Sequence, residues 1–412
     1  MLNGHFEAQP TFNAGSVNAI SDDDIVVVST ARTAMTKAKK GAQRNTALES
    51  MLKPVMEDVL KKANNFDPKL VGEVCIGNVL ANGAGVSQAR MGQLLAGIPD
   101  STPLYTINRM CSSGLQAVMN IANAIRANEI DCGMGGGVES MSLNNMQNMV
   151  DPSTLSEAVF EHEQAQKCMM PMGITSENVA EKFGITREQQ DQMAYESHMK
   201  CAHAQKLGWQ KEEITVYETT VTDKDGNEKK VIVDRDDGVR ADTTLAGLGK
   251  IRAAFKKGGT TTGGNSSQVT DGAAVVFLAR RSFAKKHNLP IRGRILSFAA
   301  VGVPPEIMGI GPAVAIPAAL KKTGLAIKDI DVWEINEAFA SQATYTVNTL
   351  AVPKEKLNRR GGAIAIGHPL GCSGARMICT LFSELDRTNE KTGVVSMCIG
   401  TGMGAAGVFQ RE

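Results

Sequence analysis

Two short signatures recur in the second half of the chain at almost the same offset. Asn78 ends a predicted strand, and Asn336 ends another 258 residues later. The Ser-Gly pairs at positions 113–114 and 373–374 each open a predicted helix and lie 260 residues apart. This agreement predicts one α/β unit that is duplicated within the chain. Chance is the alternative, because Ser-Gly pairs are common at turns.

Short apolar runs alternate with amphipathic segments in both halves. Such alternation predicts an α/β layer with a mostly parallel sheet. The predicted strands are 24–29, 71–76, 103–107, 130–138, 271–279, 329–335, 362–366 and 393–399; the predicted helices include 48–61, 87–97, 115–125, 187–207 and 338–350.

The chain divides into three predicted parts. We expect a disordered leader at 1–22, an N-terminal half at 23–280 and a C-terminal half at 281–412. Residues 144–258 are polar and Met-rich, which indicates an insertion in the first half. Within it, the charged stretch 222–240 surrounds Asp225-Gly226 and predicts a hairpin or loop.

Composition excludes several classes of function. Of the 412 residues, 42% are hydrophobic and 21% charged, as in a globular domain, and the net charge of +1 implies no polyelectrolyte partner. Aromatic content of 4% is too low for base-stacking platforms, so we expect no nucleic-acid partner. No apolar run reaches the roughly 18 residues of a membrane helix, and no secretory signal is visible.

The eight cysteines form no C-x-x-C pair, which argues against zinc-ribbon and thioredoxin-like sites. We therefore expect free thiols, a reducing compartment and no metal. A G-x-G-x-x-G pattern at 402–407 is followed by only five residues, too few for a crossover helix and a second strand. No permanently bound cofactor is predicted.

Cys111 lies in NRMCSSGLQAV, directly before a predicted amphipathic helix. Unpaired N–H groups and the positive end of the helix dipole favour thiolate at such a position, and thiolate is the nucleophilic form. The alternative is a small buried cysteine at a tight corner.

Three residues near the C-terminus complete a possible constellation. His368, in GGAIAIGHPLGCSGAR, is expected at a strand end in a partly open corner, although a structural histidine is the alternative. Cys398 ends the strand GVVSMCI, before a glycine-rich loop whose N–H groups suit an oxyanion; a core cysteine is the alternative. Asn336 is either a helix N-cap or the holder of a catalytic water. Two thiols and an imidazole suit acyl transfer through a thioester.

At these residues the chain resembles the thiolases. The resemblance covers nearly everything from Asp24 to Glu412. It is carried by NRMCSSGLQA, GVESMS, MGITSENVAEKFGITREQQD, GNSSQVTDGAA, VGVPPEIMGIGPA, EINEAFA, GGAIAIGHPLGCSGAR and CIGTGMGAA. It implies two α/β halves in a five-layered αβαβα thiolase fold with an inserted loop domain, in a homodimer or a dimer of dimers.

The resemblance also implies roles for single residues. His368 would activate Cys111, which attacks the 3-keto carbon of a 3-ketoacyl-CoA, while Cys398 moves protons at the acetyl-CoA enolate and at CoA. A water on Asn336 and the N–H groups of Cys111 and Gly400 would bind oxyanions. Coenzyme A, a co-substrate, would contact Arg240, Phe255, Gly263, Ser267 and Phe339, whereas a serine of the bacterial biosynthetic members is replaced here by Gly247.

Within the family the chain is most similar to the peroxisomal 3-ketoacyl-CoA thiolases. Biosynthetic acetoacetyl-CoA thiolases carry His-Met-Gly above the acyl pocket, where this chain has Pro171, Met172 and Gly173. Loss of the imidazole favours an acyl tail and a degradative, β-oxidation enzyme. The alternatives are a biosynthetic thiolase, a decarboxylating ketoacyl synthase and a non-enzymatic CoA- or lipid-binding module.

The resemblance implies a peroxisomal location, with the mitochondrion and the cytosol as alternatives. The family's N-terminal signal, [RK]-[LVI]-x5-[HQ]-[LA], is not found in MLNGHFEAQPTFNAG, and FQRE is not a tripeptide of the S-K-L kind.

Overall fold

The structure is a computed structural model that describes residues 19–146 and 149–412. The expected leader, 1–22, lies mostly outside these residues. Its described end contacts the body: the carbonyl oxygens of Ala19 and Ser21 accept hydrogen bonds from Arg294 and Arg281.

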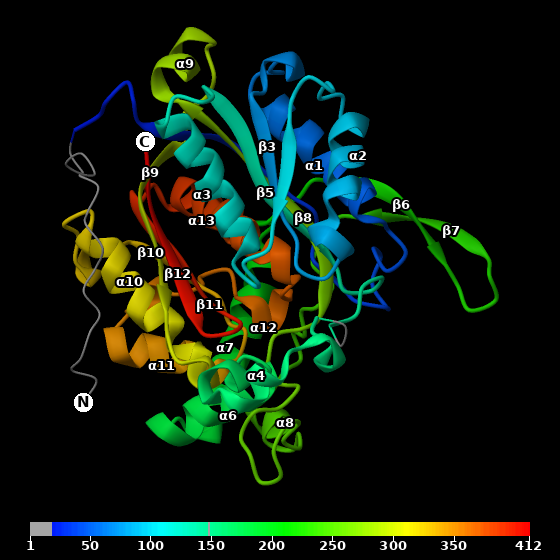
Figure 1. Cartoon of the computed structure of the whole chain (residues 1–412), viewed down its shortest axis with the longest axis vertical. Helices are drawn as coiled ribbons and strands as arrows, with labels where there is room; N and C mark the ends of the chain where they lie inside the picture. The colour runs from blue at the N-terminus through cyan, green and yellow to red at the C-terminus, as the bar shows by residue number, and fades with distance from the viewer. Residues whose placement is uncertain (1–18, 147–148) are drawn as a thin grey trace.

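One continuous sheet runs through the molecule, in the order β10-β11-β12-β9-β1-β8-β5-β3-β4, and β2 pairs with β8 off this path (Figure 1). Its two parts join where Val26 and Val27 pair with Arg294 and Gly293. The strands are β1 (Ile25–Arg32), β2 (Thr36–Lys37), β3 (Glu73–Gly77), β4 (Leu104–Ile107), β5 (Cys132–Ser140), β8 (Thr270–Arg280), β9 (Gly293–Gly302), β10 (Val332–Ile335), β11 (Thr392–Ile399) and β12 (Met403–Arg411).

The sheet is mixed, so the expectation of a mostly parallel sheet was wrong. Only β3 with β4, β3 with β5 and β10 with β11 pair in parallel among the described strands. Strand β12 follows β11 after a tight turn and therefore pairs with it antiparallel, as in a hairpin. Strand β8, which returns from the insertion, is antiparallel to both β5 and β1.

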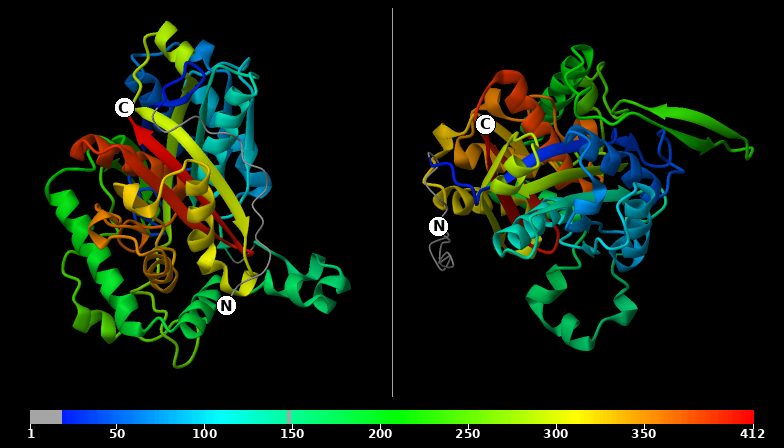
Figure 2. Two further views of the ribbon diagram at one scale, coloured as in Figure 1. Left: turned by 90° about the vertical axis from the view of Figure 1, so that its left-hand side faces the viewer. Right: turned by 90° about the horizontal axis from the view of Figure 1, so that it is seen from above.

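Helices on both sides of each half-sheet give five layers (Figures 1 and 2). Helices α1 and α2 cover one outer face, α3 and α13 pack together between the half-sheets, and α10 and α11 cover the other outer face. Three separate hydrophobic clusters fill the spaces between these layers. The bounds are α1 (Leu48–Lys62), α2 (Val86–Leu95), α3 (Ser113–Arg126), α9 (Arg281–Lys286), α10 (Gly311–Lys321), α11 (Ala340–Leu350), α12 (Ala363–Ile366) and α13 (Leu370–Thr388).

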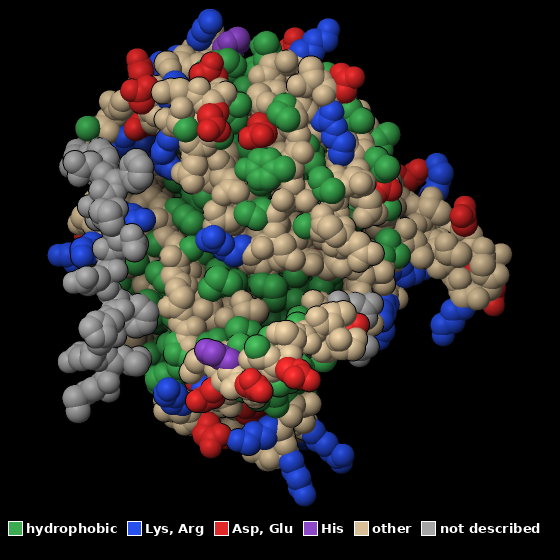
Figure 3. All heavy atoms as spheres, in the orientation of Figure 1, with side chains coloured by type: hydrophobic (Ala, Val, Ile, Leu, Met, Phe, Trp, Pro, Cys, Tyr) green, Lys and Arg blue, Asp and Glu red, His purple; other side chains and the backbone are tan. Residues whose placement is uncertain are grey.

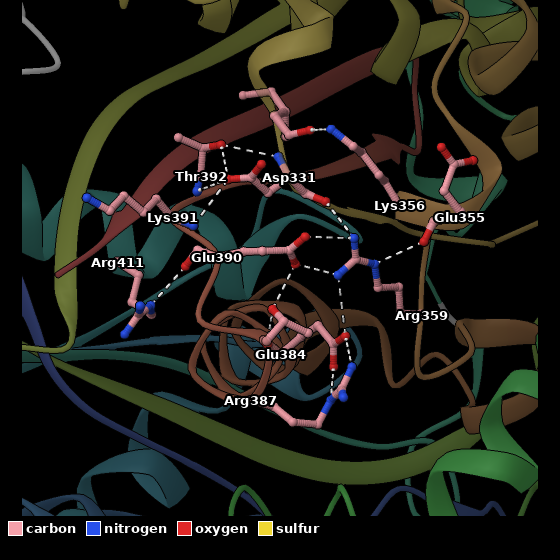
Figure 4. Close-up of polar contacts among 12 residues, drawn as sticks. Asp331, Glu355, Lys356, Arg359, Glu384, Arg387, Glu390, Lys391, Thr392 and Arg411 are labelled. Carbon is pink, nitrogen blue, oxygen red and sulfur yellow. Dashed lines mark hydrogen bonds and ion pairs between the residues drawn. The ribbon is translucent and has the colours of Figure 1, made fainter.

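Helix α13 is the centre of the molecule. Every residue from Leu370 to Leu385 is buried, as expected of a helix that is covered on all sides. Its far end is fixed by ion pairs (Figure 4), in which Glu384 accepts from Arg387 at 3.0 Å and Glu390 accepts from Arg359 at 3.1 Å.

Glycines let α13 approach its neighbours closely. A Cβ built on Gly137 of β5 would lie 2.0 Å from the carbonyl oxygen of Gly371, and one on Gly374 would lie 2.4 Å from the backbone nitrogen of Leu115 in α3. Any larger residue at these positions would push the layers apart. The glycine-rich strand β5 therefore brings the beginnings of α3 and α13 together.

The insertion carries its own elements and projects from the body (Figure 2). The predicted hairpin is present as β6 and β7. Buried Arg32 of β1 anchors the segment through Asp236 at 2.7 Å and Glu213 at 3.0 Å.

On the face in Figure 3, apolar side chains gather above the lobe that carries α4 and α6. The elements are α4 (Glu157–Glu161), α5 (Glu163–Lys167), α6 (Met172–Phe183), α7 (Arg187–Lys206), β6 (Tyr217–Thr222), β7 (Glu228–Val233) and α8 (Leu245–Gly249).

One predicted strand was wrong and others were missed. In the predicted strand 362–366, residues 363–366 instead form the short helix α12, because an apolar run this short carries no periodicity that separates a helix from a strand. Strands β9 and β12 and helix α10 were not predicted. No helix in the described part of the chain combines the length and the apolar character that crossing a membrane requires.

Candidate active site

Four chain segments approach one another around Cys111. They are the turn before α3, the turn before α13, the end of β10 and the turn between β11 and β12. The first two meet because a Cβ on Gly114 would lie 2.6 Å from the carbonyl oxygen of Gly371. The turn between β11 and β12 is also close to Cys111, since a Cβ on Gly400 would lie 2.9 Å from Cε of Met110.

Cys111 is held in a tight turn directly before α3. Met110 has a φ of +47°, an uncommon value for a residue with a side chain. Ser113 fixes the turn, because its Oγ accepts from the backbone N–H of Arg109 at 2.9 Å and donates to the carbonyl oxygen of Met110 at 2.6 Å. The predicted position of Cys111 at a helix start is confirmed.

The Cys111 thiol is nevertheless not a thiolate in the free protein. Burial raises its pKa to about 11, although the N–H groups of Gly400 and of Cys111 itself lower it in part. The N–H groups do favour thiolate, as expected. Their effect on the pKa is smaller than the opposing effect of burial, because Cys111 is only 3% exposed. The thiol therefore needs a base.

His368 lies between α12 and α13, and it is buried rather than partly open as expected. Its Nδ1 lies 2.5 Å from Oγ of Ser373, and that hydroxyl also donates to the carbonyl oxygen of Pro369. This pattern places the proton on Nδ1 and makes Nε2 the unprotonated, accepting nitrogen of the ring. Burial and the charge of Arg376 lower the pKa of His368 to about 3, so the ring is neutral in the free protein.

Asn336 lies beside His368. Its Nδ2 is 3.4 Å from Nε2 of the ring. The N-cap interpretation was wrong, because α11 begins four residues later, at Ala340, and Phe339 is its N-cap. The Oδ1 atom of Asn336 is buried and has no hydrogen-bond partner among the described residues, so it is free to bind a small polar group.

Cys398 is the second thiol of the site. It is the penultimate residue of β11 and fully buried; burial and the nearby Cys111 both raise its pKa above the usual value. The turn that follows is tight: Thr401 and Gly402 have φ of +68° and +94°. A Cβ at Gly402 would lie 2.4 Å from the carbonyl oxygen of Val303, so only glycine fits there.

Most of the residues expected to bind CoA form a second group. The rings of Phe255 and Phe339 meet edge to face, with centroids 6.1 Å apart. Gly173 lies against Phe255, and its neighbour Met172 packs on the hydrophobic cluster that contains Cys111. The backbone N–H of Ser267 donates to the carbonyl oxygen of Ala338 at 3.0 Å, next to Phe339.

The other two expected CoA contacts are exposed. Gly263 lies in the loop that leads to Ser267, with nothing within 4 Å of a built Cβ. Arg240 bonds elsewhere, since its backbone N–H donates to Nδ1 of His198 at 3.2 Å.

Sequence reasoning missed three residues near the reacting groups. Ser373 was noted as a landmark of the duplication, not as the partner of His368. Arg376 lies one turn further along the same helix, and its charge acts on His368. Glu139 is a buried carboxylate that bonds to the start of α13. The available signal for Glu139 was a charged residue near the end of an otherwise apolar, glycine-rich strand.

All eight cysteines have free thiols. Among the described residues, no group of three or more His, Cys, Asp or Glu side chains is arranged to hold a metal ion.

Two family models match the chain, "Thiolase, N-terminal domain" at residues 25–282 and "Thiolase, C-terminal domain" at residues 289–411. A mouse protein named 3-ketoacyl-CoA thiolase A, peroxisomal, is 54% identical over 95% of this chain and 91% of its own length. The structure of the dimeric peroxisomal thiolase of Saccharomyces cerevisiae is 46% identical, with a TM-score of 0.87, over 96% of this chain and 99% of the other. The human mitochondrial 3-ketoacyl-CoA thiolase in complex with CoA is 36% identical, with a TM-score of 0.84, over 95% and 98% of the two chains.

Proposed function

The chain belongs to the thiolase family, and from this premise we propose that it cleaves 3-ketoacyl-CoA with CoA, giving acetyl-CoA and an acyl-CoA shortened by two carbons. The observation that supports the proposal is that two thiols lie close together, and that a neutral imidazole directly precedes α13, whose first turn packs against the start of α3 beside Cys111. The N–H of Gly400 hydrogen-bonds to the Cys111 sulfur, and Cys111 lies close enough to Cys398 to raise the pKa of the Cys398 thiol. Ser373 and Asn336 orient the His368 ring.

In the first half-reaction the Cys111 proton passes to Nε2 of His368 as the sulfur attacks C3 of the substrate. The C2–C3 bond then breaks, which leaves the shortened acyl group on Cys111 as a thioester. The electron pair of the broken bond forms the acetyl-CoA enolate, and this takes the proton of Cys398. Both thiols begin protonated because burial raises the pKa of each.

In the second half-reaction Cys398 regains its proton from the thiol of CoA. The CoA thiolate attacks the thioester, and the leaving sulfur of Cys111 recovers its proton from His368. The free enzyme is thereby restored, so the two substrates react in turn. Because Cys398 gives and takes one proton per cycle, removing its thiol should block both half-reactions.

Two groups of donors would stabilise the negative oxygen atoms. The N–H groups of Cys111 and Gly400 would bind the oxygen of the acylated carbon, since both already act on the Cys111 sulfur and lower its pKa. Asn336, through a water, and the His368 ring would bind the thioester oxygen of the enolate. Donors fixed before the reaction stabilise developing charge without having to reorganise.

The pantetheine arm and the acyl chain are proposed to bind at Met172, Phe255, Phe339 and Ser267. Met172 packs on the cluster that contains Cys111, and its neighbour Gly173 lies against Phe255, whose ring meets that of Phe339. Exposed Gly263 and Arg240 are assigned to the outer part of CoA. No further cofactor is required.

A degradative enzyme of broad chain length is the form we propose, because Pro171 and Met172 present no polar side-chain donor above the acyl pocket. Thiolysis assayed with acetoacetyl-CoA and with 3-ketohexadecanoyl-CoA tests it. Comparable kcat/KM for both, or a preference for the longer substrate, is expected. Activity with acetoacetyl-CoA alone would contradict it and indicate the biosynthetic type.

Assembly and location follow from the same relatives. A homodimer is proposed, since the peroxisomal thiolase of Saccharomyces cerevisiae is dimeric, and sedimentation equilibrium would distinguish a dimer from a tetramer. A peroxisomal location is proposed because the mouse relative carries that name. Residues 23–280 and 281–412 are assigned to the two halves, with the insertion at about 144–258.

A further inference from the structure

Glu139 is a buried carboxylate that the proposed mechanism leaves without a role. It lies in β5, is 0% exposed, and has no cationic partner among the described contacts. A buried carboxylate without a cation is costly unless N–H groups surround it. Burial raises the pKa of Glu139 to about 7, and the N–H donors around the side chain act in the opposite direction and favour the charged form.

Four N–H groups converge on Glu139, two on each oxygen. Oε2 accepts from the backbone of Gly371 at 2.9 Å and of Val79 at 3.0 Å. Oε1 accepts from Nδ2 of Asn78 at 3.1 Å and from the backbone of Leu80 at 3.2 Å. All four partners are donors, so only a group that accepts on both oxygens satisfies them.

These donors come from both halves of the molecule. Asn78, Val79 and Leu80 follow β3, whereas Gly371 lies in the first turn of α13, three residues after His368. Helix α13 has no side-chain cap of its own, because its N-cap residue is Pro369. Glu139 supplies that cap from the other half, and its negative charge suits the positive end of a 19-residue helix.

We propose that Glu139 is a positioning residue, which fixes His368 relative to Cys111 by tying the first turn of α13 to the loop after β3. The inference rests on the proposed function. His368 is held between two attachments in that turn, Glu139 at Gly371 and Ser373 at its own ring. Loosening the first would let the base move away from the thiol, and a shift of about 1 Å at a reacting group can cost on the order of 10²-fold in rate.

A direct electrostatic role would have the opposite sign. The charge of Glu139 raises the pKa of Cys111, so removing that charge alone would make the thiol more reactive. The neutral variant Glu139→Gln thus separates the two roles. Its amide presents one NH₂ to two N–H donors, which breaks the cap while the size of the side chain is kept.

The test compares steady-state thiolysis by wild type, Glu139→Gln and Glu139→Asp. We expect kcat to fall on the order of 10- to 100-fold in Glu139→Gln while KM changes less than about threefold, with part of the kcat recovered in Glu139→Asp, which keeps two accepting oxygens. A kcat within about threefold of wild type, or an increase, in Glu139→Gln would overturn the inference. If Glu139→Gln does not fold, Glu139→Asp serves alone, because its shorter side chain should still lower kcat. A kcat of wild-type size with a raised KM in Glu139→Asp would then overturn the inference.

Asp271→Asn is the matched control. Asp271 is also buried and accepts from Ser142 at 2.8 Å, but its described side-chain contacts stay within the N-terminal half. The Asp271→Asn variant should have a lower melting temperature with little change in kcat. A loss of kcat equal to that of Glu139→Gln would show a general structural effect and overturn the inference. Failure of the wild type to cleave any 3-ketoacyl-CoA would instead refute the proposed function.

Discussion

At the scale of single residues, the proposed thiolysis depends on which cysteine reacts. The Cys111 sulfur accepts hydrogen bonds from the N–H groups of Gly400 and of its own backbone. Cys132 of β5 is also buried and free, but its thiol donates to the carbonyl oxygen of Leu70 at 3.2 Å. Substitution of the two should therefore have very different effects.

Cys111→Ala is expected to lower kcat on the order of 10⁴-fold or more, because no other group can form the thioester. Cys132→Ala serves as the control and should keep kcat within about twofold, since its thiol bonds only to the backbone. Both are measured by thiolysis at saturating CoA. Substantial activity in Cys111→Ala would exclude it as the nucleophile.

The protonation states give a second prediction at this scale. Since the pKa of Cys111 is raised to about 11 and that of His368 is lowered to about 3, the free site holds a neutral pair. The thiolate fraction should then rise about tenfold per pH unit between pH 7 and 9. Alkylation of Cys111 by iodoacetamide, followed by peptide mapping, should increase accordingly. A rate that is already constant above pH 6 would indicate a thiolate–imidazolium pair instead.

Sequence reasoning located the reacting residues better than their environments. Cys111, His368 and Cys398 stand in local turn motifs, which short-range patterns reveal. Burial is set by tertiary packing, so the closed position of His368 and the raised pKa of Cys111 could not be predicted. Glu139 was missed because its four donors come from segments about 60 and about 230 residues away.

At the scale of elements, the contact between α3 and α13 positions the site. Both helices begin next to a reacting residue, and they touch through small residues. A Cβ at Gly374 would lie 2.4 Å from the backbone nitrogen of Leu115, which cannot move without displacing α3. The alternation of strands and helices predicted both helices, but nothing local predicted that they cross.

Gly374→Ala is expected to lower the free energy of unfolding by about 1–3 kcal/mol and to reduce kcat, because the added methyl group separates the two helix starts. Gly249→Ala is the control, since nothing lies within 4 Å of its built Cβ and its φ is not positive. Urea denaturation and thiolysis measure the two effects. Equal behaviour of the variants would contradict the close contact.

At the scale of the whole molecule, buried charges attach the insertion to the body. Arg32 of β1 contacts Glu213 and Asp236 at side-chain exposures of 0–1%. Lys53 and Glu57, by contrast, form a pair on α1 that is 43–46% exposed. The polar composition of the insertion predicted a separate segment, but not the ion pairs that fix it.

Arg32→Met should destabilise the protein by about 3–5 kcal/mol, because two buried carboxylates lose their nearest cationic partner. Lys53→Met should change stability by less than about 1 kcal/mol, since water already solvates that pair. Chemical denaturation followed by circular dichroism compares them. A loss below about 1 kcal/mol in Arg32→Met would show that the network does not hold the insertion.

The duplicated architecture brings together two cysteines and a histidine from opposite halves, and one measurement tests whether they act as proposed. The protein is incubated with 3-ketohexadecanoyl-CoA without free CoA, quenched in acid, digested and mapped by mass spectrometry. We expect a tetradecanoyl thioester on Cys111 alone, formed together with acetyl-CoA and discharged when CoA is added. An acyl group on another residue, or acetyl-CoA formed with no acylated peptide, would contradict it.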